Sequence, residues 1–305
     1  MSFASNVKDE LAIQEKEYIK DEMSAILKVA GNVAISNQQL SIVFSTENTK
    51  VVKKVMKDIR TLYDCNLETS IYQSMKLNKN KTYKLTIKEK VSEILSDLDL
   101  IEMQVIKKII LNRKRIAAFL SGCFMGCGSV NDPRTSNYHL ELSFTDEDFA
   151  KNVERLIRKV DFSPKIIKRR NNYVVYLKKA QEIADFLAFI GATSCYFEFE
   201  DERMIRDIYN SGNRIHNCDI ANLVRTNIAA NEQIKNIELI ESKVGLKTLG
   251  EDLYLLATLR LENPELSLKE LAEIFNEKTG KNVSKSTVNH MFIKLKNKAD
   301  TFKVK

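Results

Sequence analysis

The chain has 305 residues, and its 44% hydrophobic content is enough to fill the cores of two or three domains. Its 48 Lys and Arg residues outnumber its 41 Asp and Glu residues, and the formal net charge of +7 fits an anionic partner such as nucleic acid. The five cysteines form no C-x-x-C pair, which argues against a disulfide-linked protein. The first residues lack the apolar run of a signal peptide, and no stretch approaches the roughly 18 apolar residues of a membrane span, so a secreted or membrane protein is not expected.

Two segments of about 100 residues share one order of predicted elements, which indicates an internal duplication. Each begins with a helix that ends at glycine, over residues 22–31 in the first copy and 118–128 in the second. An alternating strand, an amphipathic helix, two further strands and a closing helix follow. The predicted strands span 40–45, 69–73 and 82–87, then 138–144, 165–170 and 173–177, and the closing helices span 91–98 and 180–190.

Small residues recur along both starting helices. Ala25 and Gly31 lie in the first, and Gly122, Gly126 and Gly128 lie in the second. The absence of bulky side chains predicts that the two helices pack with their backbones close together. The alternative is a glycine-rich turn that enters a strand.

Two basic clusters lie within or beside the second copy, and each is either a phosphate-binding surface or an ordinary solvated surface. One comprises Lys107, Lys108, Arg113, Lys114 and Arg115, and the other comprises Lys165, Lys168, Arg169 and Arg170.

The strand pattern ends after the second copy. Residues 211–213, Ser-Gly-Asn, predict a turn or hinge. Residues 222–241 predict a long helix, and a further helix that carries Leu253 and Leu256 is expected to stop at Asn263 and Pro264.

Near the end, the sequence has the outline of a helix-turn-helix. Apolar residues recur with helical spacing over 267–280 and again over 284–295. Gly280 is a natural helix terminator because it tolerates positive φ, and Ser284 is a good N-cap for the next helix. From Ser267 to the end there are 9 Lys against 3 Glu and 1 Asp, so the pair is strongly basic.

The second helix of this pair distinguishes a DNA-binding helix-turn-helix from a plain helical hairpin with a basic tail. Its outward face carries short hydrogen-bonding side chains, which suit contacts to base edges in a major groove. The backbone amides at its N-terminus favour a DNA phosphate. The residues that we predict to contact DNA are Ser267, Lys269, Ser284, Lys285, Ser286, Thr287, Asn289, His290, Lys294 and Lys296.

The sequence LSGCFMGCG at residues 120–128 resembles the LAGLIDADG nonapeptide of homing endonucleases, and residues 24–31 are a weaker echo. In that family two motif helices pack on a pseudo-twofold axis, and the residue before the last glycine is an acid that binds Mg²⁺. Here Ala30 and Cys127 occupy the two positions, and neither supplies the oxygen ligand that a hard cation needs. The resemblance therefore implies a nuclease fold without metal, cofactor or catalysis.

Over its full length the chain resembles the WhiA family of bacterial sporulation and cell-division regulators. The matching stretches are MSFASNVKDELA (1–12), GSVNDP (128–133), NR (213–214), NCDIAN (217–222), AA (229–230), QI (233–234), SLKEL (267–271), SKS (284–286) and VNH (288–290).

This resemblance implies an α+β protein in which two degenerate LAGLIDADG-like units form a pseudo-twofold saddle, followed by an all-α domain. The expected boundaries are 1–105, 106–205 and 206–305, with the helix-turn-helix at about 267–297.

The implied function is non-catalytic binding of double-stranded DNA by a transcriptional regulator of cell division and chromosome segregation. Such a protein is expected in the cytoplasm with the nucleoid, and division or transcription proteins are further candidate partners. An interaction protein of the division machinery with incidental DNA affinity is the alternative. An active endonuclease is the least favoured reading, since Asp132, Glu141 and Asp146 are more simply turn, strand-face and cap residues.

Overall fold

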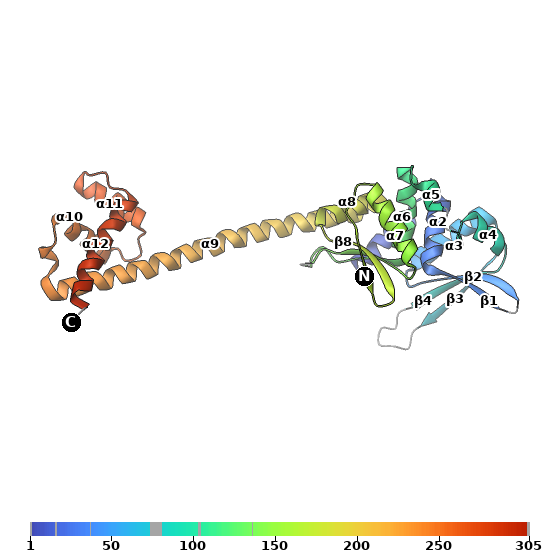
Figure 1. Ribbon diagram of the computed structural model, residues 1–305, viewed down its shortest axis with the longest axis horizontal. Helices are drawn as coiled ribbons and strands as arrows, with labels where there is room; N and C mark the ends of the chain where they lie inside the picture. The colour runs from blue at the N-terminus through green and yellow to red at the C-terminus, as the bar shows by residue number, and fades with distance from the viewer. Residues whose placement is uncertain are drawn as a thin grey trace. The chain divides into compact units, whose positions relative to one another are not determined.

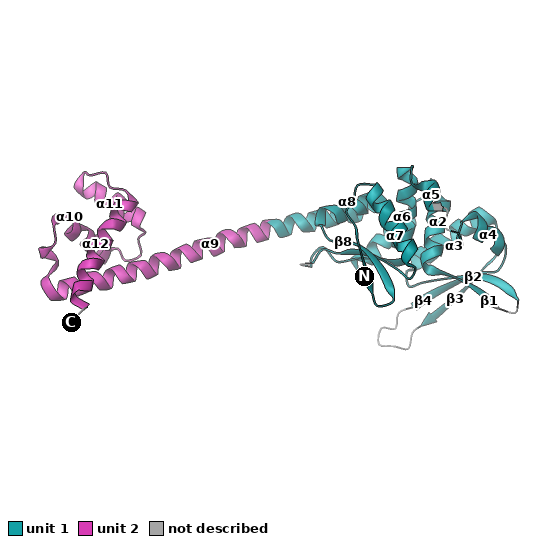
Figure 2. Cartoon of the chain, viewed as in Figure 1, with its two compact units in different colours: residues 1–207 teal, residues 208–305 magenta. Residues whose placement is uncertain are grey.

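The computed structural model describes residues 2–15, 17–36, 38–73, 81–102, 105–135 and 137–303 (Figure 1). The chain divides into two compact units, residues 1–207 and 208–305 (Figure 2). The first unit is α+β, and the second is built from helices. Among the described residues, no helix is long and apolar enough to cross a membrane.

The first unit contains the same arrangement twice, so the predicted duplication is confirmed. Each copy has an antiparallel four-stranded sheet, with strand order β1-β2-β4-β3 in one and β5-β6-β8-β7 in the other. The first copy comprises α2 (Ile19–Ala30), β1 (Gly31–Ser36), β2 (Gln39–Thr46), α3 (Thr49–Tyr63), β3 (Leu67–Gln73), β4 (Lys81–Ile87) and α4 (Val91–Asp97). The second comprises α6 (Arg113–Cys127), β5 (Gly128–Val130), β6 (Leu140–Phe144), α7 (Glu147–Lys159), β7 (Lys165–Arg169), β8 (Asn172–Leu177) and α8 (Ala180–Ile190).

One continuous hydrophobic core joins the two copies. The strands alternate as the sequence predicts: Leu140, Leu142 and Phe144 of β6 are buried, and the residues between them turn to the other face. The helices lie on one side of the sheets, and the strands form the opposite side of the unit (Figure 1). The second face of each sheet carries a mixture of polar side chains, such as Glu141 and Ser143, and apolar ones, such as Ile167 and Val174.

The starting helices α2 and α6, which we call the motif helices, pack backbone against backbone. A Cβ added at Gly122 would lie 2.3 Å from the carbonyl oxygen of Glu22, and one at Gly126 would lie 2.1 Å from a methyl carbon of Val29. The predicted close approach is thus confirmed at these two glycines. Gly31 and Gly128 instead fit the alternative, a glycine at the entry to a strand, because each ends its helix and begins a strand.

Several elements have no counterpart in the sequence prediction. Helix α1 (Phe3–Ile13) buries a narrow stripe of Phe3, Val7 and Leu11 among polar residues, and Ser2 caps it. Strand β1 is an edge strand with mostly exposed or half-exposed side chains, so it shows no burial pattern. Helix α5 (Val105–Ile109) has only five residues, too few for a helical period to show.

The turn predicted at residues 211–213 is wrong. These residues are helical and lie within α9 (Thr193–Val244), which contributes to both units and includes the helix expected at 222–241. A glycine inside a helix costs only about 1 kcal/mol relative to alanine, which does not end a helix of 52 residues. A Cβ added at Gly212 would meet no described atom within 4 Å, so the position has room for a side chain.

The second unit closes around a separate core in which Ile237 and Ile240 of α9 meet the last three helices. Its other elements are a short 3₁₀ turn (Leu246–Thr248), α10 (Glu251–Glu262), α11 (Leu268–Thr279) and α12 (Lys285–Lys303). Helix α10 ends just before Asn263 and Pro264, as predicted.

Candidate nucleic-acid interface

Helices α11 and α12 form the predicted helix-turn-helix, and local chemistry sets where α11 begins and ends. The Ser267 hydroxyl accepts from the amide of Glu270 at 3.3 Å, and the Glu270 carboxylate accepts from the amide of Ser267 at 2.7 Å. This reciprocal capping box satisfies amides that the helix leaves unpaired. Gly280 terminates the helix with φ of 68°, and its amide donates to the Asn276 carbonyl at 2.8 Å.

The turn between the helices is held by the side chain of Asn276, which sequence reasoning did not single out. Its amide nitrogen donates to the carbonyl of Val283 at 3.0 Å, and its oxygen accepts from the Val283 amide at 2.8 Å. These bonds join residues that are seven positions apart, so the connection over 280–284 is a defined turn. The only sequence signal is an asparagine placed one turn before a terminating glycine.

Replacing Asn276 with alanine is expected to loosen this turn. Two half-buried backbone groups lose their partners, at a cost of about 1–3 kcal/mol to the local structure. Amide hydrogen exchange of the full chain, read over residues 281–288, should speed up by about tenfold or more. Asn282→Ala is the matched control, because Asn282 is an exposed asparagine of the same turn. Equal exchange in the two variants would contradict the role of Asn276.

Helix α12 presents two distinct faces. Val288, Met291, Phe292 and Leu295 are buried against α10 and α11. The helix continues eight residues past the predicted end at Leu295, because Ala299 extends its buried stripe. The opposite face exposes Ser286, Asn289 and His290, as the sequence predicts, together with Ile293 and Asn297.

The predicted contact residues fall into three groups. Ser286, Thr287, Asn289, His290, Lys285 and Lys294 are exposed, and neither lysine forms an ion pair within the described part of the chain. Ser267 and Ser284 are caps, and the Ser284 hydroxyl accepts from the Thr287 amide at 3.3 Å. Two lysines have acidic neighbours: Lys296 pairs with Glu232 of α9 at 2.7 Å, and Lys269 lies 3.9 Å from Glu273.

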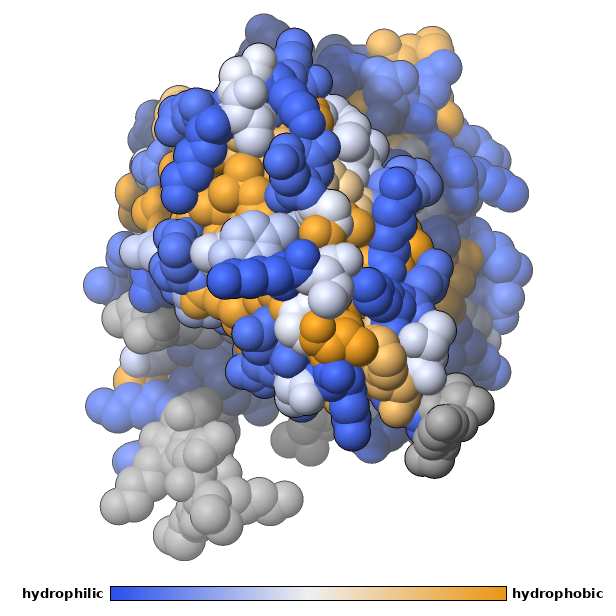
Figure 3. Space-filling view, turned by 90° about the vertical axis from the view of Figure 1, so that its left-hand side faces the viewer, coloured by the Kyte–Doolittle hydropathy of each residue, from blue (hydrophilic) through white to orange (hydrophobic). Residues whose placement is uncertain are grey.

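Apolar side chains also reach the surface of this unit. Tyr254 and Leu261 of α10 are 41% and 40% exposed, and Ile293 of α12 is 42% exposed. Figure 3 shows apolar patches between hydrophilic side chains on the face of the unit that it displays. The surface of this unit is therefore mixed.

In the first unit, the ends of the motif helices carry Ala30 and Cys127 at the positions where the resemblance expects acids. The Cys127 thiol donates to the Cys123 carbonyl at 3.3 Å, and burial raises its pKa to about 12, so it stays protonated near neutral pH. Lys8 of α1 lies near Cys127, and burial lowers the pKa of its ammonium group, an effect that Cys127 and Glu47 oppose. A cation of the chain itself thus lies near this helix end.

The three acids near the motif helices take the roles predicted for them. Asp132 stabilises a turn by accepting from the Arg134 amide at 2.9 Å. Glu141 lies on the face of β6, within 2.9 Å of His139. Asp146 caps α7 by accepting from the Phe149 amide at 2.7 Å. In the described residues no group of three or more His, Cys, Asp or Glu side chains is placed to hold a metal ion.

The basic cluster at 107–115 is partly neutralised by acids that are distant in sequence. Arg113 pairs with Asp161 at 3.1 Å, and Arg115 pairs with Asp21 at 2.7 Å. Lys114 lies 3.5 Å from Glu17. On the second cluster, Arg169 lies 3.3 Å from Glu141, and the Lys168 ammonium lies 5.4 Å from the ring centre of Tyr173.

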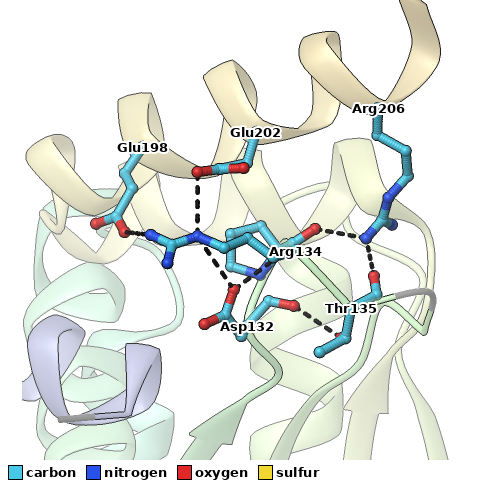
Figure 4. Close-up of polar contacts among 7 residues, drawn as sticks. Asp132, Arg134, Thr135, Glu198, Glu202 and Arg206 are labelled. Atoms are coloured by element: carbon cyan, nitrogen blue, oxygen red, sulfur yellow. Dashed lines mark hydrogen bonds and ion pairs between the residues drawn. The ribbon is translucent and has the colours of Figure 1, made fainter. Parts of the chain in front are cut away.

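A polar cluster fastens the first turns of α9 to the loop that follows β5 (Figure 4). Arg134 of the loop lies between Glu198 and Glu202, at 3.6 and 3.1 Å. Arg206 donates to the carbonyl of Pro133 at 2.8 Å and to that of Thr135. The loop at the end of the GSVNDP stretch, residues 133–135, therefore positions α9, a structural role that the sequence did not reveal.

The fold and these sites define a class: a protein with two LAGLIDADG-like halves and a helix-turn-helix. Three family models match the chain: "WhiA N-terminal LAGLIDADG-like domain" at residues 16–101, "WhiA LAGLIDADG-like domain" at 116–209 and "WhiA C-terminal HTH domain" at 213–299. The chain belongs to the WhiA family.

Relatives and solved structures agree with this membership. "Probable cell division protein WhiA" of Enterococcus faecalis is 40% identical, covering 100% of this chain and 99% of that protein, and the Lactobacillus gasseri protein of the same name is 39% identical over 99% of each. The crystal structure of full-length DUF199/WhiA from Thermatoga maritima aligns with a TM-score of 0.61 at 26% identity, covering 99% of each chain. The N-terminal LAGLIDADG domain of DUF199/WhiA shares the fold, with a TM-score of 0.51 at 22% identity over 62% of this chain and 90% of that one.

Proposed function

We propose that this protein is a non-catalytic regulator that reads duplex DNA with the exposed face of α12 and acts in cell division and chromosome segregation. One observation carries the DNA-binding part: the face of α12 opposite its buried stripe exposes Ser286, Asn289 and His290 side by side. Side chains of this size and hydrogen-bonding capacity suit base edges in a major groove. The link to division is supported by the name of the relatives, "Probable cell division protein WhiA".

Phosphate contacts would come from the start of α12 and from flanking lysines. Lys285 and Thr287 lie in the first turn, where helix amides and the helix dipole favour an anion. Lys294 is exposed two turns further along. Lys296 would have to leave Glu232 to join them, so we expect it to contribute less than Lys285.

The non-catalytic part of the proposal rests on the ends of the motif helices. Metal-assisted cleavage of a phosphodiester needs a divalent cation on oxygen ligands. Ala30 has no donor atom in its side chain, and Cys127 is a buried thiol that keeps its proton. Supercoiled plasmid incubated with the full chain and Mg²⁺ is expected to remain intact, and Mg²⁺-dependent nicking would overturn this part.

Variants of α12 test the recognition face. In the full chain, Asn289→Ala or His290→Ala should relax base preference by about 1–3 kcal/mol for each lost specific contact, because base contacts carry the sequence information. Lys285→Ala should weaken binding to all sequences alike and reduce its salt dependence. Selection of bound duplexes from a random library, with fluorescence anisotropy against salt, measures both effects.

Lys247→Ala is the control for charge, since this exposed lysine lies outside α11 and α12. If the α12 variants selected the same sequences with wild-type affinity, the recognition face would be wrongly assigned. Absence of duplex binding by the full chain would instead favour an interaction protein of the division machinery.

A further inference from the structure

A small basic cavity of about 220 Å³ lies in the second unit. It is bounded by α9, the end of α10 and the first turns of α11 and α12. Among the residues that the structure describes, no Asp or Glu lines it, and its polar lining is dominated by Arg225, Gln233, Arg260, Ser267, Lys269 and Lys285. A water molecule occupies roughly 30 Å³ of liquid, so a tetrahedral oxyanion fits in this volume.

Arg260 is the buried part of this lining, and its guanidinium forms no ion pair within the described chain. The side chain is 1% exposed, and its Nη1 donates to the carbonyl of Leu266 at 2.7 Å and to those of Asn263 and Pro264 at 3.3 Å each. Its Nε has no hydrogen-bond partner within the described chain, and no described carboxylate lies within 4.0 Å of the guanidinium. A buried charge without an opposite charge is costly. The carbonyl contacts explain how Arg260 shapes the loop. The Phe292 ring lies 5.5 Å from the guanidinium, and Glu265 opposes the effect of burial, but burial still lowers the pKa of Arg260, so the charge is only partly compensated.

Other features of the cavity also favour an anion. The Oε1 atom of Gln233 is buried without a partner among the described residues, and rotating this amide by 180° would turn an N–H donor to the same position. The first turns of α11 and α12 both line the cavity, at Ser267 and Lys285. The side chains of Ser267 and Ser284 cap one amide in each of these turns, and the helix dipole adds partial positive charge at both helix starts. The lining thus combines cationic side chains with two helix starts.

We propose that this cavity is a phosphate site, with Arg260 as its fixed buried cation and with Arg225, Lys269 and Lys285 closing around the phosphate oxygens. Arg225 belongs to α9, outside the helix-turn-helix. A phosphate held here ties α9 to the starts of both DNA-reading helices. The phosphate group comes either from the backbone of bound DNA, a form that rests on the proposed function above, or from free phosphate.

Arg225 offers the cleanest test because its side chain is exposed, so its replacement should leave the fold intact. In the full chain, Arg225→Gln should weaken duplex binding by about tenfold at low salt for every sequence and lower the slope of log affinity against log salt by about one. Arg214→Gln is the matched control, an exposed arginine of the same helix that does not line the cavity. It should leave the slope unchanged.

A second measurement detects free phosphate. Amide resonances at the starts of α11 and α12 are followed while inorganic phosphate replaces chloride at constant ionic strength. If a backbone phosphate is the ligand, Arg225→Gln lowers the DNA salt slope; if free phosphate is the ligand, this variant leaves DNA binding unchanged but abolishes the phosphate-induced shifts.

The proposal is overturned if Arg225→Gln changes neither measurement relative to Arg214→Gln. The proposed function survives that outcome provided that Asn289→Ala still alters base preference. Conversely, if the wild-type chain binds no duplex DNA, the proposed function falls, while the phosphate titration still decides the fate of the cavity.

Discussion

Replacing Gly122 with alanine is expected to destabilise the α+β unit by about 2–3 kcal/mol, because overpacking at a rigid contact costs about that much. The new Cβ would lie 2.3 Å from the carbonyl oxygen of Glu22 and 2.8 Å from the Cβ of Ala25. The first of these atoms belongs to the backbone of α2, so relief requires the motif helices to separate. Thermal unfolding by calorimetry, with hydrogen exchange to assign the affected unit, measures the loss.

Gly212→Ala is the matched control for this change, because Gly212 also lies within a helix but its side is open. There the substitution should stabilise the helix by up to about 1 kcal/mol, through the higher helix propensity of alanine. The same substitution is thus expected to have opposite signs at two helical glycines. A Gly122→Ala protein as stable as the wild type would show that the motif helices are not in backbone contact.

Replacing Lys54 with methionine is expected to cost about 3–5 kcal/mol, the loss typical of breaking a buried ion pair from one side. The Lys54 ammonium lies 3.0 Å from the carboxylate of Glu22 and 3.2 Å from that of Asp58, and it donates to the Gln14 carbonyl at 3.1 Å. Burial alone would lower the pKa of Lys54, but Glu22 and Asp58 outweigh burial and raise it. The ammonium is therefore charged, and its removal leaves buried negative charge without that partner.

Lys53→Met serves as the control, since Lys53 is the exposed neighbour on the same helix, and it should change stability by less than about 0.5 kcal/mol. Adding Glu22→Gln to Lys54→Met should recover part of the loss, because a neutral amide is cheaper to bury and can still accept from the Ser121 hydroxyl, which now contacts Glu22 at 2.8 Å. Chemical unfolding of the full chain measures all three proteins. Equal losses in Lys53→Met and Lys54→Met would refute a role for the buried ion triad.

Local patterns were sufficient to predict most elements near the candidate DNA site. The apolar spacing of 268–275 and 288–295 places both helices, and Ser267 and Gly280 mark the ends of the first. The duplication was equally visible, because α3 and α7, the equivalent helices of the two copies, carry the same apolar spacing. Such features depend on near neighbours along the chain, so periodicity and capping residues report them directly.

The sequence by itself determined the helix-turn-helix, the repeated α+β halves and the absence of acids at Ala30 and Cys127. Only the tertiary structure decided which distant residues meet: it placed Gly122 against Glu22, gave the basic cluster around Arg115 its acidic partners, and buried Arg260 in the wall of a cavity. It also carried α9 through Gly212, where the local signal favoured a turn. The physical reason is that helical propensity and capping act within one or two turns, whereas burial, close packing and charge pairing depend on segments that folding brings together.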